Sequence, residues 1–242
     1  MVTKNQIKLI QSLQQKKYRS KHQMFVVEGR KSILEFLTQN FQVESIFATD
    51  YFSELLPKSK TILTTKDVLE KMSSFKNPDE GVAIFKIPLP QPIVDEGIIV
   101  ATDDIRDPGN LGTIIRLCDW FGVQHLVCSY QTVDCYNPKV VQASMGSLGR
   151  VNIHYEDLHI FLKNSKLPIL ATAMDGENIY QTSFPKEGIL VLGNEANGIS
   201  KLNLEIAHQI LTIPKFGSLQ QAESLNVATA TAILLSELKR NS

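Results

Sequence analysis

The second half of the chain alternates short apolar runs with segments whose apolar residues recur at helical spacing. The apolar runs predict strands at 98–102, 125–128, 169–173, 189–192 and 210–213, and a weaker run allows a sixth at 150–154. The helical spacing predicts helices at 110–121, 138–147, 157–163, 201–207 and 224–238. This alternation is typical of an α/β domain with a mostly parallel sheet covered on both faces.

The first half of the chain has shorter elements. The pattern predicts strands at 24–29, 43–49, 61–65 and 81–87, and helices at 5–15, 30–39 and 67–72. The segment KKYRSKHQ, residues 16–23, is expected to be a polar loop. These elements form a small α/β unit of about 87 residues, close to the lower size range of an independent domain.

A proline-rich stretch separates the two halves. Pro88, Pro90 and Pro92 oppose both helix and strand and favour an extended, semi-rigid connector. We therefore expect one domain at 1–90, a linker at 91–97 and a second domain at 98–242.

The charge balance excludes nucleic-acid binding that is driven by a strong positive charge of the whole protein. Lysine and arginine number 25, aspartate and glutamate number 25, and the formal net charge is zero. The first 31 residues are nevertheless basic, with eight lysines and arginines against Glu28. Taken alone, such a run favours a solvated helix face.

The three cysteines lack the CxxC or CxxH spacing of a zinc site, and their odd number argues against a disulfide framework. We expect no metal. No apolar run approaches the ~18 residues of a membrane span, and no apolar signal core follows the basic N-terminus. A cytoplasmic location without membrane association is the resulting expectation.

The stretch DDIRDPGNLGTIIRLCDWFG, residues 103–122, connects a strand to a helix at the carboxyl end of the predicted sheet, where open α/β sheets bind ligands. Pro108 and Gly109 predict a turn, and Asn110 is expected to cap the helix. Arg116 could form an ion pair with Asp119 on an exposed helix edge, or it could serve the ligand site.

Three further strands end in polar loops at the same edge. GNEANG, residues 193–198, has the glycine spacing of a P-loop but lacks its lysine, and no GxGxxG follows a strand. These features argue against an NTPase and a dinucleotide site. Gly193 and Gly198 fit either a plain tight turn or close backbone approach to a flat ligand. Ser224 is expected to cap the last helix, with Asn226 in its first turn.

RDPGNLGTIIR, LGNEANGIS and IPKFG…AESLNVATA resemble, in order and spacing, the three motifs of the SpoU (TrmH-type) RNA ribose 2′-O-methyltransferases of the SPOUT superfamily. KKYRSKHQMFVVEGRKSI resembles the L30e-like substrate-binding domain that precedes them in this family. The resemblance implies an α/β SPOUT domain with a trefoil knot, S-adenosylmethionine as methyl donor, RNA as substrate and a homodimer.

The resemblance also assigns roles to individual residues. The catalytic candidates are Asn110, Arg116, Glu195, Ser224 and Asn226. The candidates for cofactor contact are Thr172, Ala173, Leu192, Gly193, Ile213 and Leu225. The candidates for RNA contact are Arg19, Lys21 and Arg30.

The implied reaction methylates a ribose 2′-hydroxyl, of ribosomal RNA in preference to transfer RNA. A guanidinium has a pKa above about 12, so Arg116 is expected to position the hydroxyl and stabilise its developing charge rather than act as a base. Two alternatives remain open: a transfer RNA 2′-O-methyltransferase, and a non-catalytic RNA-binding or assembly protein that keeps the fold. Methylation of a base nitrogen is disfavoured because the motifs resemble the ribose-modifying branch.

Overall fold

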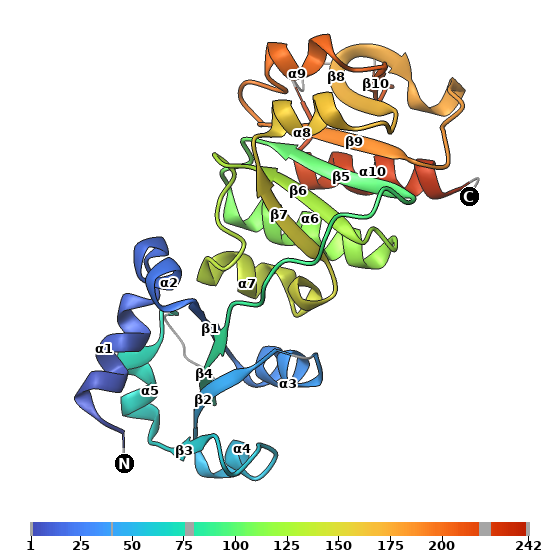
Figure 1. The fold of residues 1–242 in the computed structure, drawn as a ribbon. Coiled ribbons are helices and arrows are strands. Elements are labelled where there is room, and N and C mark those ends of the chain that lie inside the picture. Colours follow the sequence, from blue (N-terminus) through green and yellow to red (C-terminus); the bar gives the residue numbers. More distant parts are fainter. Residues whose placement is uncertain (1, 40, 76–79, 218–223, 241–242) are drawn as a thin grey trace. The chain divides into compact units, whose positions relative to one another are not determined.

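The computed structural model describes residues 2–39, 41–75, 80–217 and 224–240. The chain divides into two compact units (Figure 1). The first comprises Met1–Leu89 and Asp134–Gly149, and the second comprises Pro90–Val133 and Arg150–Ser242. Among the described residues, no helix is long and apolar enough to cross a membrane.

The first unit contains a four-stranded sheet in the order β1-β4-β2-β3. Its strands are β1 (Met24–Glu28), β2 (Val43–Ala48), β3 (Thr61–Leu63) and β4 (Gly81–Lys86). β4 pairs antiparallel with both β1 and β2, whereas β3 pairs parallel with β2. The four strands predicted for the first half of the chain are thereby confirmed.

In the described part of residues 1–75, five helices accompany this sheet. They are α1 (Lys4–Ser12), α2 (Lys16–His22), α3 (Arg30–Thr38), α4 (Asp50–Ser53) and α5 (Lys66–Met72). The prediction of a polar loop at 16–23 is wrong, because α2 occupies it. The buried residue of this helix is Arg19, which is only 2% exposed, so a pattern of apolar residues could not reveal the helix.

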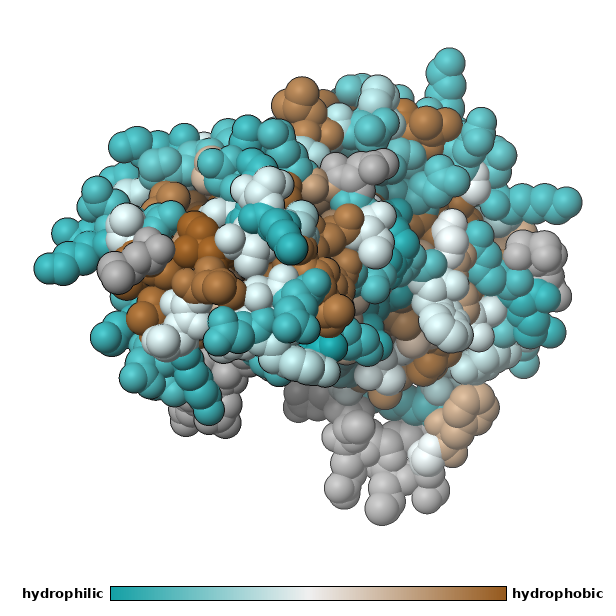
Figure 2. Space-filling view, turned by 90° about the horizontal axis from the view of Figure 1, so that it is seen from below, coloured by the Kyte–Doolittle hydropathy of each residue, from teal (hydrophilic) through white to brown (hydrophobic). Residues whose placement is uncertain are grey.

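The core of the first unit lies on both faces of its sheet. Ile10 and Leu13 of the N-terminal helical region pack with Leu69 and Met72 of α5 in one cluster. Elsewhere in the unit the rings of Phe25 and Phe36 meet edge to face, with centroids 5.7 Å apart. On the face that Figure 2 shows, hydrophobic residues form brown patches between hydrophilic ones. The large exposed hydrophobic side chains of this unit include Tyr51, Leu55 and Leu63.

A later segment of the chain completes the first unit. It contains α7 (Pro138–Ser144) and the short 3₁₀ helix η1 (Ser147–Gly149). Met145 ends α7 in the left-handed conformation, so the helix is shorter than the predicted 138–147. The Tyr136 ring of this segment lies 4.7 Å from that of Phe25, centroid to centroid.

The second unit contains a six-stranded sheet in the order β10-β8-β9-β5-β6-β7, and every neighbouring pair is parallel. Its strands are β5 (Ile98–Asp103), β6 (His125–Ser129), β7 (Asn152–Glu156), β8 (Ile169–Asn178), β9 (Gly188–Gly193) and β10 (Gln209–Thr212). The predicted α/β class with a mostly parallel sheet is confirmed, including the sixth strand at 150–154.

Helices cover both faces of this sheet (Figure 1). α6 (Pro108–Trp120) and α10 (Val227–Arg240) lie together on one face. α8 (Leu158–Asn164) and α9 (Lys201–Glu205) lie on the other, where Ile99, Ala101, Leu158 and Leu162 share a core cluster. The 3₁₀ helix η2 (Ile179–Gln181) follows β8.

The order of strands brings two loops together at the carboxyl edge of the sheet. Asp103 at the end of β5 is paired with Gly193 at the end of β9. From β5 the chain continues towards β6 on one side, while β9 and β8 lie on the other side. Such a switch point is where open α/β sheets bind ligands. The loops after β5 and β9 carry the first and second motifs.

Candidate active site

Asp107 determines where α6 begins. Its carboxylate accepts a hydrogen bond from the Asn110 backbone N–H at 2.8 Å, and Pro108 occupies the first helical position. The prediction that Asn110 is the N-cap is therefore wrong. Aspartate is a favoured cap, and proline is tolerated at the first position because the backbone N–H it lacks would have no helical partner. The Asn110 side chain is thus free to make contacts outside the helix.

The loop after β9 is a tight backbone turn that presents Glu195 to solvent. Asn194 and Gly198 exchange two backbone hydrogen bonds of 2.8 and 3.0 Å. A Cβ on Gly193 would stand 2.3 Å from the Gly198 backbone and 2.4 Å from that of Ile199. The close approach of two backbone segments at Gly193 supports the tight-turn interpretation of this glycine.

Asn226 is the residue that caps α10. Its side-chain oxygen accepts hydrogen bonds from the backbone N–H groups of Ala228 at 3.0 Å and Thr229 at 3.2 Å. The predicted cap, Ser224, is wrong by two residues, and Asn226 lies before the first turn rather than within it. Asparagine is among the best N-caps, which gives a physical reason for its place at the start of this helix.

Three of the five catalytic candidates form one hydrogen-bonded chain. The Asn226 amide Nδ2 donates to Asn110 Oδ1 at 2.9 Å, and the Asn110 amide Nδ2 donates to Glu195 Oε1. These hydrogen bonds therefore link the starts of α6 and α10 to the loop after β9. One carboxylate oxygen of Glu195 is used in this way, and its other oxygen has no hydrogen bond to any residue in the described part of the chain.

Arg116 lies on α6, two turns into the helix, with an exposed side chain. The alternative of an ion pair with Asp119 is wrong, because the Asp119 carboxylate accepts from Arg150 Nε at 2.9 Å. The guanidinium of Arg116 has no hydrogen bond or ion pair with the residues that the structure describes. Its five donors are available to a bound ligand.

Ser224 is exposed and does not join the hydrogen-bonded chain of Asn226, Asn110 and Glu195 within the described ranges. Residues 218–223, which precede it, lie outside the described residues. Its assignment as a catalytic residue stays a prediction.

Four of the six cofactor candidates lie where β8 leaves β9. The ladder between these strands ends at Ala171 and Val191, and β8 then pairs with β10 through Glu177 and Asn178, so that the pairing skips residues 172–176. Thr172 donates its hydroxyl to the Val191 carbonyl at 3.1 Å. Peptide groups past the end of a ladder can bind the edge of a flat heterocycle such as adenine.

The other cofactor candidates lie at or after the ends of β9 and β10 along the chain. Leu192 is buried and Gly193 ends β9, while Ile213 follows β10 directly. Leu225, between Ser224 and the cap of α10, is 49% exposed. The individual contacts of these residues with a cofactor stay predictions.

The RNA-contact candidates differ in exposure. Arg19 is buried, and its guanidinium donates to the Asp134 carboxylate at 2.5 and 2.9 Å and to the carbonyls of Leu13 and Gln14. Because these contacts occupy it inside the first unit, Arg19 does not suit a phosphate contact. Lys21 is exposed on α2.

Arg30, the third RNA-contact candidate, begins α3 and is partly exposed. It forms a 3.5 Å ion pair with Glu80, and its guanidinium carbon lies 5.3 Å from the centroid of the Tyr51 ring. These contacts hold the side chain against its own unit, whereas Lys21 remains available to a polyanion.

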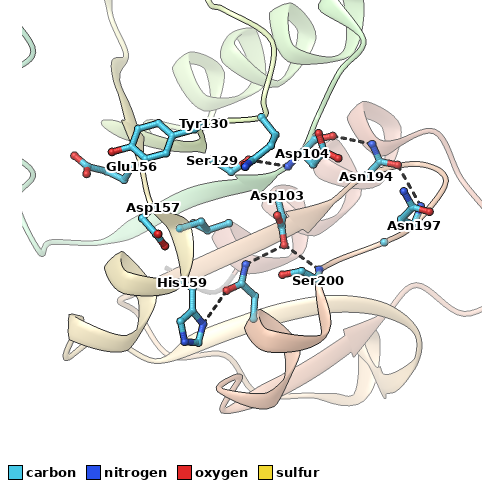
Figure 3. Close-up of a pocket in the computed structure, with 14 residues that line it drawn as sticks. Asp103, Asp104, Ser129, Tyr130, Glu156, Asp157, His159, Asn194, Asn197 and Ser200 are labelled. Carbon is cyan, nitrogen blue, oxygen red and sulfur yellow. Dashed lines mark hydrogen bonds between the residues drawn. The ribbon is translucent and has the colours of Figure 1, made fainter.

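A polar pocket of about 340 Å³, which the sequence pattern did not predict, lies beside these loops (Figure 3). Its wall holds Asp103, which accepts from the Ser200 N–H and the Asn203 amide, both at 2.9 Å. It also holds Asn194, which donates to the Asp104 carbonyl at 2.7 Å. The only sequence signal for these anchors was their place at the ends of strands. Within the described residues, no group of three or more His, Cys, Asp or Glu side chains could hold a metal ion.

The cysteines of the second unit are unsuited to nucleophilic chemistry. Cys118 and Cys128 are fully buried, and burial raises the pKa of Cys128 to about 12. Because the thiolate is the nucleophile, a thiol of this kind is inert near neutral pH. Both side chains contribute to the apolar core, as the sequence predicts.

Comparison with known proteins identifies both parts of the chain. Residues 97–236 match the SpoU rRNA Methylase family, and residues 4–83 match the MRM3-like substrate binding domain. A Bacillus subtilis (strain 168) relative named 23S rRNA (guanosine(2553)-2′-O)-methyltransferase RlmP is 30% identical, over 98% of this chain and 97% of its own length.

Solved structures agree over the full length of the chain. A Porphyromonas gingivalis protein assigned to the TrmH family of RNA methyltransferases is 36% identical, with a TM-score of 0.90 and complete coverage of both chains. An AdoMet-bound rRNA methyltransferase from Sinorhizobium meliloti is 28% identical, with a TM-score of 0.87, and the match covers 100% of this chain and 96% of that one. The family match spans more than half of the sequence and includes all three motif loops, so this chain belongs to the SpoU rRNA methylase family.

Proposed function

We propose that this protein methylates a ribose 2′-hydroxyl of ribosomal RNA, with S-adenosylmethionine as the methyl donor. The observation that carries the proposal is the hydrogen-bonded chain of Asn226, Asn110 and Glu195, which assembles three motif loops at one edge of the sheet. The ribosomal substrate is supported by the Bacillus subtilis relative, which is named for 23S rRNA and matches over nearly its whole length.

The cofactor supplies an electrophilic methyl group when it is bound beside these loops. Thr172, Ala173, Leu192, Gly193, Ile213 and Leu225 would hold it, because the first four lie where β8 and β9 separate and the last two lie on the segment after β10. The protein itself orients the ribose, so that its 2′-hydroxyl is aligned with the methyl group and misaligned arrangements are excluded. Correct alignment alone can contribute roughly 7–11 kcal/mol to lowering the barrier.

Arg116 and Glu195 are two charged groups of the described motif segments that a substrate could contact. The exposed guanidinium of Arg116 would position the ribose 2′-hydroxyl and its adjacent phosphate, and would stabilise the negative charge that develops on the oxygen. The free carboxylate oxygen of Glu195 would accept a hydrogen bond from the nucleotide. Asn110 and Asn226 hold that carboxylate in place.

The first test is ribose-methylation mapping of total RNA from cells with and without the protein. We expect one or more 2′-O-methyl marks in ribosomal RNA to disappear when the protein is removed. Loss of a mark in transfer RNA instead would redirect the substrate assignment. Failure of the purified protein to bind S-adenosylmethionine at millimolar concentration in calorimetry would support the alternative of a non-catalytic RNA-binding protein.

The second test concerns Arg116. Arg116→Ala should lower the turnover by about 100-fold or more, because removing one preorganised donor costs roughly 10²–10³ in kcat. Arg116→Lys keeps the charge and loses the planar donor pair, so we expect it to recover only part of the rate. Turnover equal to that of the unmodified protein in both variants would remove Arg116 from the mechanism.

We also propose that the protein acts as a homodimer with the knotted topology that the family resemblance implies. The support within this chain is Trp120 on α6, whose side chain is 84% exposed and therefore does not pack in the core of its own unit. Large exposed aromatic residues are enriched at protein interfaces. Light scattering coupled to gel filtration should report a mass of two chains, and a Trp120→Ser variant should shift the equilibrium towards one.

A further inference from the structure

We propose that Asn194 is a positioning residue for the reaction: it holds Glu195 against Asn110 by tying the loop after β9 to the end of β5. The inference rests on the proposed role of Glu195. Asn194 contributes no atom to the hydrogen-bonded chain of Asn226, Asn110 and Glu195. It acts instead on the backbone that carries the Glu195 side chain.

Asn194 uses its whole side chain inside this loop. Its oxygen Oδ1 accepts from the backbone N–H groups of Ala196 at 2.8 Å and Asn197 at 3.2 Å, which fixes the shape of the turn. Its nitrogen Nδ2 donates to the Asp104 carbonyl at 2.7 Å, a contact between residues 90 positions apart (Figure 3). One amide therefore shapes the turn with its oxygen and places the turn on the sheet with its nitrogen.

Asp104 is a rigid anchor for this contact. It adopts a left-handed conformation with φ of 60°, which is uncommon for a residue other than glycine. Its backbone N–H donates to Ser129 Oγ at 2.9 Å, and its carboxylate accepts two hydrogen bonds of 2.8 Å from Arg106. The anchor is thus fixed from the neighbouring strand β6 and from its own turn.

The same anchor leads directly into α6. Asp104 is followed within three residues by Asp107, the cap that places Asn110. Asp104 is therefore connected to both partners of the Asn110–Glu195 hydrogen bond. The backbone leads from Asp104 to Asn110 within six residues, and the Asp104 carbonyl accepts from Asn194, the residue before Glu195. The distance between Glu195 and Asn110 therefore depends on the backbone from Asp104 to Asn110 and on the Asn194–Asp104 hydrogen bond, and not on the two exposed side chains alone.

Glu195 needs such support because it is exposed. Residues 195–198 have exposed side chains or none, so packing does not restrict the Glu195 rotamer. The far end of the loop is held at Ser200, whose N–H donates to Asp103. Without the Asn194–Asp104 contact, strand pairing that ends at Gly193 would be the remaining link, among the described residues, between the near end of the loop and β5. A displacement of about 1 Å in a reacting constellation can cost on the order of 100-fold in rate.

The test uses Asn194→Asp in the full-length protein, with Asn197→Ala as the matched control. Aspartate keeps the acceptor for Ala196 and Asn197 but replaces the donor to the Asp104 carbonyl with an oxygen. Asn197 is an exposed amide of the same loop, and its side chain has no hydrogen bond within the described residues. We expect Asn194→Asp to lower kcat about 10-fold or more, with the cofactor Kd unchanged within about twofold. Asn197→Ala should keep the unmodified kcat.

A double-mutant cycle separates positioning from general destabilisation. If Asn194 acts through Glu195, Asn194→Asp should cost little further rate in a Glu195→Ala background, because coupled residues do not show additive losses. A full additional loss in that background would overturn the proposal. Should Asn194→Asp fail to fold, Asn194→Ala serves in the same cycle, since it removes both functions of the amide without adding charge.

A crystal structure of the Asn194 variant tests the inference without relying on activity. Glu195 should leave Asn110 in that variant and stay on it in Asn197→Ala. An unmoved Glu195 in the Asn194 variant overturns the proposal whatever the rates. An unmodified protein that methylates no RNA would contradict the proposed function alone, because the crystallographic comparison would still decide the role of Asn194.

Discussion

At the scale of single residues, two histidines meet inside the second unit. His125 Nδ1 lies 3.3 Å from His154 Nε2, and both rings are buried. The Val94 backbone N–H donates to His125 Nε2 at 3.3 Å, so in the neutral pair His125 carries its proton on Nδ1 and donates it to His154. The pair joins β6 and β7 to the segment that enters the sheet.

This pair predicts that stability falls in mild acid. Burial lowers the pKa of His125 despite the nearby Asp95 carboxylate, and burial together with the charge of His125 lowers the pKa of His154. The unfolded chain therefore binds more protons as the pH falls below about 6.5, so the free energy of unfolding decreases from there down through the folded-state pKa values.

Urea denaturation at pH 7.5 and pH 5.5 measures this effect. His154→Gln should reduce the difference in unfolding free energy between the two pH values, since glutamine does not titrate. His22→Gln, at an exposed position on α2, is the control and should leave the difference unchanged. Equal pH dependence in both variants would contradict the assignment to the buried pair.

At the scale of elements, the start of α6 connects stability with catalysis. Asp107→Ala removes the cap and leaves the Asn110 N–H without its partner, which costs about 1 kcal/mol. We expect the melting temperature to fall by about 2–4 °C. Because Asn110 moves with the helix start, kcat should fall as well. Asp107→Asn keeps an acceptor and should restore both values; a normal kcat in a destabilised Asp107→Ala protein would separate the cap from the site.

The elements that could be predicted from the sequence are those with an apolar signature. The strands of the second unit were predictable because they are buried on both faces and read as continuous apolar runs. Helix α2 was not, since the side chain that anchors it is an arginine. The starts of α6 and α10 were misplaced by a few residues because several polar residues near each start could act as the cap.

The site was predictable in its members but not in its contacts. The motifs identified Asn110, Glu195 and Asn226, yet their hydrogen bonds join residues 85 and 116 positions apart, which spacing along the chain cannot reveal. The contact between Asn194 and Asp104 was missed for the same reason. Arg19 was misassigned because a basic run resembles a phosphate-binding surface whether its members are exposed or buried.

At the scale of the whole molecule, removing two basic residues of α2 should affect different properties: the stability of the protein in one case and its affinity for RNA in the other. Arg19→Ala leaves the Asp134 carboxylate without its buried partner, and breaking such a pair costs about 3–5 kcal/mol of stability. Lys21→Ala should leave the unfolding free energy unchanged and weaken RNA binding. If Lys21 contacts a phosphate, the slope of the logarithm of affinity against that of salt concentration should become shallower by about 1.

Thermal unfolding and filter binding at several salt concentrations distinguish these outcomes. An Arg19→Ala protein that is as stable as the unmodified one, yet loses salt-dependent RNA affinity, would restore Arg19 as a phosphate contact. A Lys21→Ala protein with an unchanged salt slope would remove α2 from the RNA surface.

The crowding at Gly193 has a consequence for how this enzyme can diversify. The added methyl group of alanine would collide with backbone on the other side of the loop, so this position tolerates no side chain without rebuilding the turn. Ala196 and Asn197, by contrast, are exposed between two pinned ends. Nucleotide preference could therefore be retuned at Ala196, the exposed neighbour of Glu195, in evolution or in a selection experiment, while the frame that carries Glu195 stays unaltered.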